Sequence, residues 1–266
     1  MKRRFDKMHG LGNDFVVVDA RAQPFEVTPS LARAIADRRT GIGCDQLILI
    51  EASDTADLRM RIWNSDGSEV EACGNATRCV VQLTGAARIE TDGGLLTGAQ
   101  LDGQVEVTLQ EPRFGWDEIP LAYPMDTAAL PMAWGPLEHP TAVNVGNPHV
   151  VFFVGDPSSI VMEELGPTIE NDAIFPQRVN VNVAAATPSG IHLRTWERGA
   201  GLTLACGTGA CATAVAAIKA KRVTSPVEVT MPGGSLTIDW SVGQPIRMRG
   251  AATHVFGGEL DLEALQ

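Results

Sequence analysis

Ala72-Cys73-Gly74-Asn75 returns in the second half of the chain as Ala205-Cys206-Gly207-Thr208, and the Arg61-Ile62-Trp63 that precedes it returns as Arg194-Thr195-Trp196. The arginine, tryptophan, alanine, cysteine and glycine recur at one offset of 133 residues (206 − 73) in a chain of 266. A constant offset of half the length indicates that one structural unit was duplicated, with one cysteine of this kind in each copy.

A second repeat, earlier in each half, supports the duplication. Leu11–Val17 (LGNDFVV) is similar to Val145–Val151 (VGNPHVV). We therefore expect two domains of ordinary size, one over residues 1–113 completed by a C-terminal return over 255–266, and one over 114–254. The boundary falls at the start of a proline-rich stretch, Pro112 to Pro140.

The composition is that of a globular protein, with 44% hydrophobic and 20% charged residues. A net charge of −11 argues against a nucleic-acid partner, which would need a basic surface. The chain shows neither a signal peptide nor an apolar run that could span a membrane, so we expect no membrane partner and a cytoplasmic location. Five cysteines without a CxxC pair or a zinc-finger histidine predict free thiols and no metal site.

Short β-type segments, separated by Gly, Pro and Asp, dominate the chain. Strands are expected over Phe15–Asp19, Leu47–Glu51, Leu58–Trp63, Val105–Leu109, Thr141–Val145, Val150–Val154, Ile191–Trp196, Val227–Met231, Leu236–Trp240 and Ile246–Gly250. Helices are expected over Pro29–Arg38, Ser158–Leu165, Asn75–Arg88 and Thr208–Lys221. The last of these is apolar nearly all round, which suits a helix enclosed by a sheet. The predicted fold class is α+β, with two pseudo-symmetric domains, each a β-rich sheet or barrel wrapped around a central helix.

Each cysteine of the repeat directly precedes a predicted central helix. A thiol there faces unpaired backbone N–H groups and the positive end of the helix dipole, and both favour the thiolate. Two such thiols could remove and return a proton at opposite faces of one carbon, so Cys73 and Cys206 are the candidate catalytic residues. A single free cysteine is more often a buried core residue, but that reading does not explain matched positions in both copies. The other cysteines, Cys44, Cys79 and Cys211, are interpreted as core.

At these residues the chain resembles the diaminopimelate epimerase family. The resemblance covers nearly the whole chain and rests on eight motifs in the family's order: Gly10–Phe15, Gly43–Gln46, Trp63–Glu69, Ala72–Asn75, Gly146–His149, Arg178–Asn180, Trp196–Gly199 and Ala205–Cys211. It implies epimerisation of LL-diaminopimelate to meso-diaminopimelate, in lysine and cell-wall precursor biosynthesis, by an isomerase that uses neither pyridoxal phosphate nor any other cofactor. It also implies a homodimer with the site between the two domains.

The resemblance carries roles to individual positions. Cys73 and Cys206 would form the two-base pair, one acting as thiolate and the other as thiol. Substrate contacts would come from Asn13, Gln46, Asn64, Gly74, Asn75, Asn147, Asn180, Glu197, Arg198, Gly207 and Thr208. His149 and Glu197 would adjust the pKa values of the cysteines. Neutral amides suit a substrate with two ammonium and two carboxylate groups, and an arginine suits its distal carboxylate.

The residues leave other functions open. A proline or hydroxyproline racemase would also use two cysteines, although it would not need so many amides and an arginine. A thiol-redox protein or an amino-acid binding protein remains possible, and Asn13 and Asn147, taken singly, suit turns. A pyridoxal enzyme is disfavoured because none of the four lysines, Lys2, Lys7, Lys219 and Lys221, is placed like a buried Schiff-base lysine.

Overall fold

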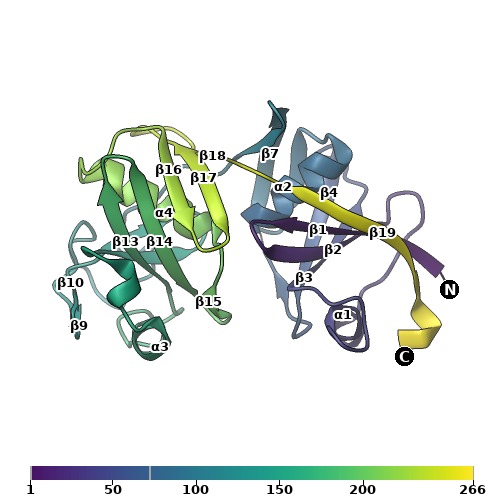
Figure 1. Cartoon of the computed structure of the whole chain (residues 1–266), viewed down its shortest axis with the longest axis horizontal. Helices are drawn as coiled ribbons and strands as arrows, with labels where there is room; N and C mark the ends of the chain where they lie inside the picture. The colour runs from purple at the N-terminus through teal and green to yellow at the C-terminus, as the bar shows by residue number, and fades with distance from the viewer. Residues whose placement is uncertain (1, 72, 266) are drawn as a thin grey trace. The chain divides into compact units, whose positions relative to one another are not determined.

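The structure is a computed structural model that describes residues 2–71 and 73–265 (Figure 1). Met1, Gln266 and Ala72, which opens the first copy of the repeated phrase, lie outside the described residues. The chain forms two compact units, one built from Met1–Val107 and Gly250–Gln266 and the other from Thr108–Arg249. Both combine a sheet with helices, which confirms the predicted α+β class.

The elements of the first unit are β1 (Lys2–Gly10), β2 (Asn13–Asp19), α1 (Pro29–Ala36), β3 (Gln46–Glu51), β4 (Leu58–Asn64), β5 (Glu69–Val70), α2 (Gly74–Thr84), β6 (Arg88–Thr91), β7 (Gly94–Leu101), β8 (Gln104–Thr108), β19 (Thr253–Asp261) and η2 (Leu262–Leu265). Those of the second unit are β9 (Ala133–Trp134), β10 (Leu137–Glu138), β11 (Thr141–Asn144), β12 (Pro148–Phe153), η1 (Pro157–Ser159), α3 (Met162–Glu170), β13 (Asn180–Thr187), β14 (Gly190–Glu197), β15 (Gly201–Thr203), α4 (Gly207–Lys219), β16 (Val227–Met231), β17 (Gly234–Asp239) and β18 (Arg247–Gly250).

The same order of strand pairing occurs in both units. In the first, β1 is antiparallel to β2, β2 is parallel to β3, β3 is antiparallel to β4, and β4 is parallel to β6. In the second, β11, β12, β13, β14 and β16 pair in the same alternation. The repeat of the sequence is therefore also a repeat of the fold.

A central helix packs against the sheet of each unit, α2 in the first and α4 in the second (Figure 1). Every residue of α4 from Gly209 to Ala217 is buried, as the apolar composition predicted. Most of these side chains are small, so the surrounding strands can approach the helix on several faces. The sheet thereby fixes where the N-terminus of each central helix, and the cysteine before it, lies.

All four predicted helices have wrong boundaries. α4 spans Gly207–Lys219 and not Thr208–Lys221. α1 ends at Ala36 and not at Arg38, because Asp37 already has extended backbone angles. α2 ends at Thr84 and not at Arg88, because Gly85 adopts a left-handed conformation (φ 72°) and its N–H closes the last turn on Val81. The helix predicted over Ser158–Leu165 is divided into η1 and α3 by an extended segment at Ile160.

Some strands were missed because their sequence patterns are weak. β1 carries charged residues at consecutive positions, and β13 is buried on both faces, so neither shows the usual alternation of apolar and polar residues. β19 contains two adjacent glycines and is exposed over most of its length. β19 forms a strand because it pairs with β1, which is remote in the chain, and local sequence patterns do not predict such a pairing.

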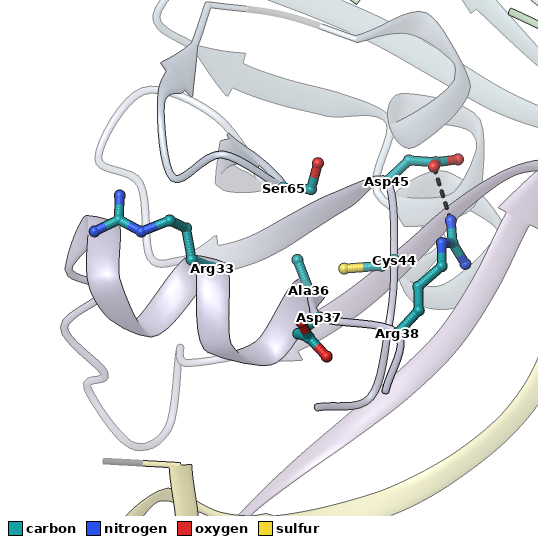
Figure 2. Close-up of a pocket in the computed structure, with 7 residues that line it drawn as sticks. All are labelled: Arg33, Ala36, Asp37, Arg38, Cys44, Asp45 and Ser65. Atoms are coloured by element: carbon teal, nitrogen blue, oxygen red, sulfur yellow. Dashed lines mark hydrogen bonds and ion pairs between the residues drawn. The ribbon is translucent and has the colours of Figure 1, made fainter. Parts of the chain in front are cut away.

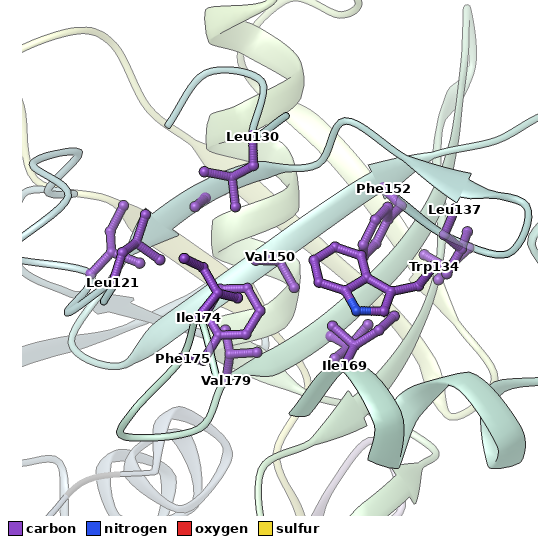
Figure 3. Packing of buried hydrophobic residues seen from close by; sticks show 14 of the residues in the cluster. Leu121, Leu130, Trp134, Leu137, Val150, Phe152, Ile169, Ile174, Phe175 and Val179 are labelled. Carbon is purple, nitrogen blue, oxygen red and sulfur yellow. The ribbon is translucent and has the colours of Figure 1, made fainter. Parts of the chain in front are cut away.

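The core of the second unit is organised around Trp134 (Figure 3). Its ring stacks on Phe175, with the ring centroids 6.2 Å apart, and meets Phe152 edge-on at 5.9 Å. The indole N–H donates to Asp172 at 2.9 Å, so the only polar atom of the side chain is satisfied. This cluster anchors β12 and β13, whose first residues carry candidate site side chains.

Helix α3 supports the end of β14 through Glu170 and Gly166. Glu170 is buried and accepts hydrogen bonds from the Trp196 indole at 2.7 Å and from the Gly199 N–H at 2.9 Å. Gly166 lies directly against the Trp196 ring, since an added Cβ would fall 2.4 Å from Cδ2 and 2.5 Å from Cγ. These contacts fix the turn that carries Glu197.

An ion-pair network in the first unit supports Asn13 and Gln46. Asp14 accepts hydrogen bonds from Lys7 and, at 2.7 Å, from Arg38. Arg38 also donates to Asp45 at 2.8 Å, as Figure 2 shows. The Asp14 N–H donates to the Asp45 carboxylate at 3.1 Å, and the Asp45 N–H donates to the Asp14 carbonyl at 3.0 Å. The two aspartates thus join the segments whose neighbouring residues are Asn13 and Gln46.

The network sets the pKa values of both aspartates. Burial alone raises the pKa of Asp14, but the hydrogen bonds from Arg38 and Lys7 outweigh it and hold that pKa well below its usual range. Burial raises the pKa of Asp45, and the neighbouring Asp14 carboxylate contributes to that rise. Asp14 is therefore the carboxylate that the fold keeps ionised.

We expect Asp14→Asn to lower the free energy of unfolding at pH 7 by about 3 kcal/mol, the lower end for removal of one partner of a buried ion pair. The folded-state pKa of Asp14 lies below its unfolded value. The stabilisation of the fold by the ionised carboxylate is therefore fully present above about pH 5 and is lost as the pH falls. Urea denaturation should show the difference from the wild type narrowing between about pH 5 and pH 3. Asp19→Asn, which alters an exposed pair with Arg21, should change stability by less than about 1 kcal/mol. A difference that does not vary with pH would contradict this assignment.

Gly166→Ala should lower the free energy of unfolding by about 1–2 kcal/mol. The overpacking against Trp196 costs about 1–3 kcal/mol and exceeds the gain of up to about 1 kcal/mol in helix propensity. The matched control is Gly155→Ala, because an added Cβ at Gly155 meets nothing within 4 Å. Equal free energies of unfolding for the two variants in urea would contradict the expected overpacking against Trp196.

Candidate active site

In the first unit, Cys73 immediately precedes α2 and is its N-cap residue, with extended backbone angles (φ −146°, ψ 113°). Its side chain is half-buried. The Cys73 carbonyl accepts hydrogen bonds from both the N–H and the hydroxyl of Thr77, each at 2.9 Å, which closes the first turn. Gly74 and Asn75 begin the helix, so their backbone N–H groups lie in its first turn, where the helix itself supplies no acceptor.

Strand register brings Asn13, Gln46 and Asn64 to neighbouring strand ends. Gln46 lies opposite Phe15 on one side and opposite Asn64 on the other. The Asn13 amide nitrogen lies 4.0 Å from the Cys73 sulfur, and the Gln46 side-chain amide donates to the Asn64 side-chain oxygen at 2.9 Å. The Gln46 side-chain oxygen is buried and has no hydrogen-bond partner among the described residues, so it is an acceptor that a ligand N–H could satisfy.

The Asn75 side chain points into the protein. It is 2% exposed, and its oxygen accepts a hydrogen bond from the fully buried Arg78 guanidinium at 2.9 Å. Arg78 also donates to the carbonyl of Ala251 at 3.3 Å, in the segment that returns to this unit. The sequence analysis missed Arg78, because an arginine inside an amphipathic helix is usually exposed.

In the second unit, Cys206 is the N-cap of α4 (φ −121°, ψ 111°) and is 3% exposed. Its sulfur accepts a hydrogen bond from the Gly209 N–H at 3.3 Å and lies 3.6 Å from the Thr208 hydroxyl oxygen. The thiol itself therefore caps the helix. Both cysteines of the repeat occupy the position that the sequence analysis expected for them.

Opposing influences act on the Cys206 thiol. Burial raises its pKa well above the usual range, and the charge of Glu197 raises it further. The hydrogen bonds from Thr208 and from the Gly209 N–H lower the pKa, because they stabilise the thiolate. Burial therefore favours Cys206 as a thiol, and the Thr208 hydroxyl and the Gly209 N–H are placed to stabilise the thiolate when the proton leaves.

His149 is connected to Cys206 by hydrogen bonds that run through the Asn147 and Thr208 side chains. It is completely buried, and burial, with a smaller contribution from the charge of Arg198, lowers its pKa to about 3. Its Nε2 lies 2.8 Å from the Asn147 side-chain oxygen, and the Asn147 amide nitrogen lies 3.3 Å from the Thr208 hydroxyl. His149 is consequently a neutral imidazole.

Asn180, Glu197 and Arg198 form the remaining part of the site in the second unit. The Asn180 oxygen accepts the Arg198 N–H at 3.0 Å, and its amide donates to the Pro148 carbonyl at 2.9 Å, so this side chain is engaged with the backbone. The Glu197 carboxylate accepts the Thr203 hydroxyl at 2.6 Å. One guanidinium nitrogen of Arg198 donates to the Gln177 carbonyl at 3.0 Å.

The other cysteines are structural, as expected. Cys44, Cys79 and Cys211 are at most 2% exposed. Burial raises the pKa values of Cys44 and Cys79 to about 12 each, so both thiols stay protonated. Within residues 2–71 and 73–265, no group of three or more His, Cys, Asp or Glu side chains is placed to hold a metal ion. None of the helices in this described part is long and apolar enough to cross a membrane.

Solved structures give the fold of the chain. A phenazine biosynthesis protein of the PhzF family from Bacillus anthracis superposes with a TM-score of 0.69 at 17% identity, covering 98% of this chain and 99% of the other. A hydroxyproline epimerase from Agrobacterium vitis superposes with a TM-score of 0.67 at 14% identity, covering 97% and 92%. At these identities the likeness concerns the fold alone.

Sequence relatives are much closer. Diaminopimelate epimerase from Rhizorhabdus wittichii is 66% identical over 99% of this chain and 97% of its own length. The enzyme of the same name from Sphingopyxis alaskensis is 64% identical over 98% of each. The sequence profile of diaminopimelate epimerase matches residues 5–114 and 141–255, which include both cysteine-capped helices. The chain, an isomerase by this relationship, belongs to the diaminopimelate epimerase family.

Proposed function

We propose that this enzyme converts LL-diaminopimelate to meso-diaminopimelate, with Cys73 and Cys206 as its two acid–base groups and without a cofactor. The observation that carries the proposal is the matched placement of the two thiols. Each is the N-cap of the central helix in one copy of a duplicated unit. Packing alone would not require a cysteine at this position twice, whereas proton transfer at two faces of one carbon would.

The proposed reaction needs no net change in the enzyme's protons. One sulfur, as thiolate, removes the α-proton, and the other, as thiol, delivers its proton to the opposite face of the same carbon. The pair holds one proton between them before and after turnover, so their titrations are coupled. In this scheme the direction of the reaction decides which cysteine is the base.

Charge that develops on the α-carboxylate would be stabilised by the helix N-termini. Gly74 and Asn75 in α2, and Gly207 and Thr208 in α4, offer backbone N–H groups at the positive end of a helix dipole. Donors that are fixed before the reaction cost no reorganisation when the charge appears. The requirement for a metal or a pyridoxal electron sink is thereby reduced.

The amides supply the recognition that a substrate with two amino-acid ends requires. In the first unit the unpartnered oxygen of Gln46 suits a substrate ammonium, and Asn13 and Asn64 lie at adjacent strand ends. In the second unit Arg198 can bind the distal carboxylate through the part of its planar fork that does not contact Gln177. A proline ring has no distal end, so Arg198 favours diaminopimelate over proline or hydroxyproline.

We also propose a cytoplasmic homodimer that serves lysine and cell-wall precursor biosynthesis. The exposed face of β19 supports a second copy as the partner. Val255 is 53% exposed and Phe256 is 48% exposed, and the Phe256 ring packs edge-on against Phe5 at 6.0 Å. Adjacent large apolar side chains on an exposed strand are typical of an interface between proteins.

Reduced wild-type protein incubated with LL-diaminopimelate in D₂O should place deuterium at one α-carbon while the meso isomer forms, with chelator present and no cofactor added. NMR of the α-positions follows both events. Cys73→Ala and Cys206→Ala should each lower turnover by at least about a thousandfold, as expected when a positioned acid or base is lost. Both variants should still bind the substrate by calorimetry. Absence of exchange in wild-type protein with its thiols shown to be reduced would refute the function. If that wild-type protein still bound the substrate, the result would indicate an amino-acid binding protein.

Phe256→Asp should shift the protein from dimer to monomer in analytical ultracentrifugation. A charge placed in an apolar interface must be desolvated without a partner. Leu101→Asp, on an exposed position of β7, serves as the control and should leave the sedimentation coefficient unchanged. A wild-type protein that sediments as a monomer would contradict the proposed homodimer.

A further inference from the structure

The second unit contains a buried series of polar side chains that continues beyond the residues assigned to the site. Asn182 is completely buried, and its amide nitrogen lies 3.0 Å from His149 Nδ1 and 3.0 Å from the Val150 carbonyl. Its oxygen accepts the Thr195 hydroxyl at 3.0 Å. Because the Val150 carbonyl can only accept, the –NH₂ end of Asn182 must face it, and this fixes the orientation of the amide.

The orientation of Asn182 determines the tautomer of His149. An N–H of Asn182 directed at Nδ1 makes Nδ1 the acceptor, so the single proton of the neutral ring lies on Nε2. That proton points to the Asn147 oxygen at 2.8 Å. The Asn147 –NH₂ end then faces the Thr208 hydroxyl oxygen at 3.3 Å, which leaves the Thr208 hydrogen directed at the Cys206 sulfur at 3.6 Å.

Every donor in this series therefore points toward Cys206. The direction runs from Thr195 through Asn182, His149, Asn147 and Thr208 to the sulfur. Hydrogen bonds aligned in one direction polarise one another, and the effect is largest where water is excluded. The series can stabilise a thiolate without placing a full positive charge beside it.

The first unit serves as an internal comparison. There, Phe15 pairs with Gln46 as His149 pairs with Asn180, and Ile48 pairs with Ile62 as Asn182 pairs with Thr195. Phe15, Ile48 and Ile62 are all completely buried. The same fold is thus built with an apolar core at these positions in the first unit, so the fold by itself does not call for polar side chains there.

The helix above the series shows the same difference between the units. An added Cβ at Gly209 would lie 2.7 Å from the Asn182 oxygen and 2.9 Å from the Thr195 hydroxyl. The equivalent position in the first unit, three residues after the N-cap Cys73, holds Ala76, which is completely buried. A glycine is needed only where the polar pair lies under the helix N-terminus.

We propose that Asn182, supported by Thr195, is a positioning residue that fixes the Nε2–H tautomer of His149 and so aims an aligned series of hydrogen-bond donors at Cys206. The role of the thiol in turnover rests on the proposed function, but the direction of the series does not. The charged groups near the thiol are Glu197 on β14, which opposes the thiolate, and Arg198, which acts on His149. His149 on β12 is neutral, so it contributes a dipole rather than a charge.

The direct test is the tautomer of His149 in ¹⁵N-labelled protein, read from long-range ¹H–¹⁵N correlation spectra and assigned by the signal that His149→Gln removes. Wild-type protein should show a pyrrole-type Nε2 and a pyridine-type Nδ1. Asn182→Leu should introduce the Nδ1–H tautomer, because it removes the donor to Nδ1. A wild-type spectrum with the proton on Nδ1, or on both nitrogens at pH 7, would overturn the proposal whether or not the protein is an epimerase.

The second test is the reactivity of Cys206 toward iodoacetamide as a function of pH, resolved by peptide mass spectrometry. Asn182→Leu should raise the midpoint by roughly one pH unit, and Thr195→Val, which removes only the first hydroxyl, should raise it by less. Turnover of Asn182→Leu should fall by roughly tenfold to a hundredfold in kcat, the usual effect of losing the outer partner of a functional histidine. Thr213→Val is the matched control, because Thr213 is equally buried and its hydroxyl has no hydrogen-bond partner in residues 2–71 and 73–265. An unchanged Cys206 midpoint in Asn182→Leu would overturn the proposal.

Discussion

The candidate site depends on one constraint, which is that a cysteine occupies the N-cap position of each central helix. The N-cap position leaves the sulfur next to backbone N–H groups that no other part of the helix can satisfy. At Cys206 this is a direct contact, with the Gly209 N–H 3.3 Å from the sulfur. The helices can present their N-termini in this way because each is held by the sheet of its own unit.

Two copies of one unit have been adapted differently around this shared feature. In the first, Cys73 is half-buried and the positions beneath the helix are apolar, with Phe15, Ile48 and Ile62 completely buried. In the second, Cys206 is buried and the corresponding positions are His149, Asn182 and Thr195. Burial disfavours the charged form of Cys206, and the polar side chains oppose that effect with dipoles. The duplicated fold therefore holds its two thiols in different electrostatic environments.

Supporting networks outside the site keep its side chains in place. Asp14, Arg38 and Asp45 join the segments that carry Asn13 and Gln46, and Glu170 holds the end of β14 that carries Glu197. Glu170 is buried and the Asp14 side chain is mostly buried, and both carboxylates accept hydrogen bonds, which is the condition under which such groups stabilise a fold. Their position behind the site residues explains why polar groups are retained there.

The sequence by itself determined the duplication, the α+β class, the cysteine at the start of each central helix and the family, because these depend on residue order and local pattern. Local pattern also located Asn13 and Asn147, which follow glycines in matched motifs. Only the tertiary structure revealed Asp14 with Arg38, Arg78, and the aligned series through Asn182 and Thr195. Those roles arise from strand register and from burial between distant segments, and a side chain such as Asn182 carries no local sign of the partner that it meets across the sheet.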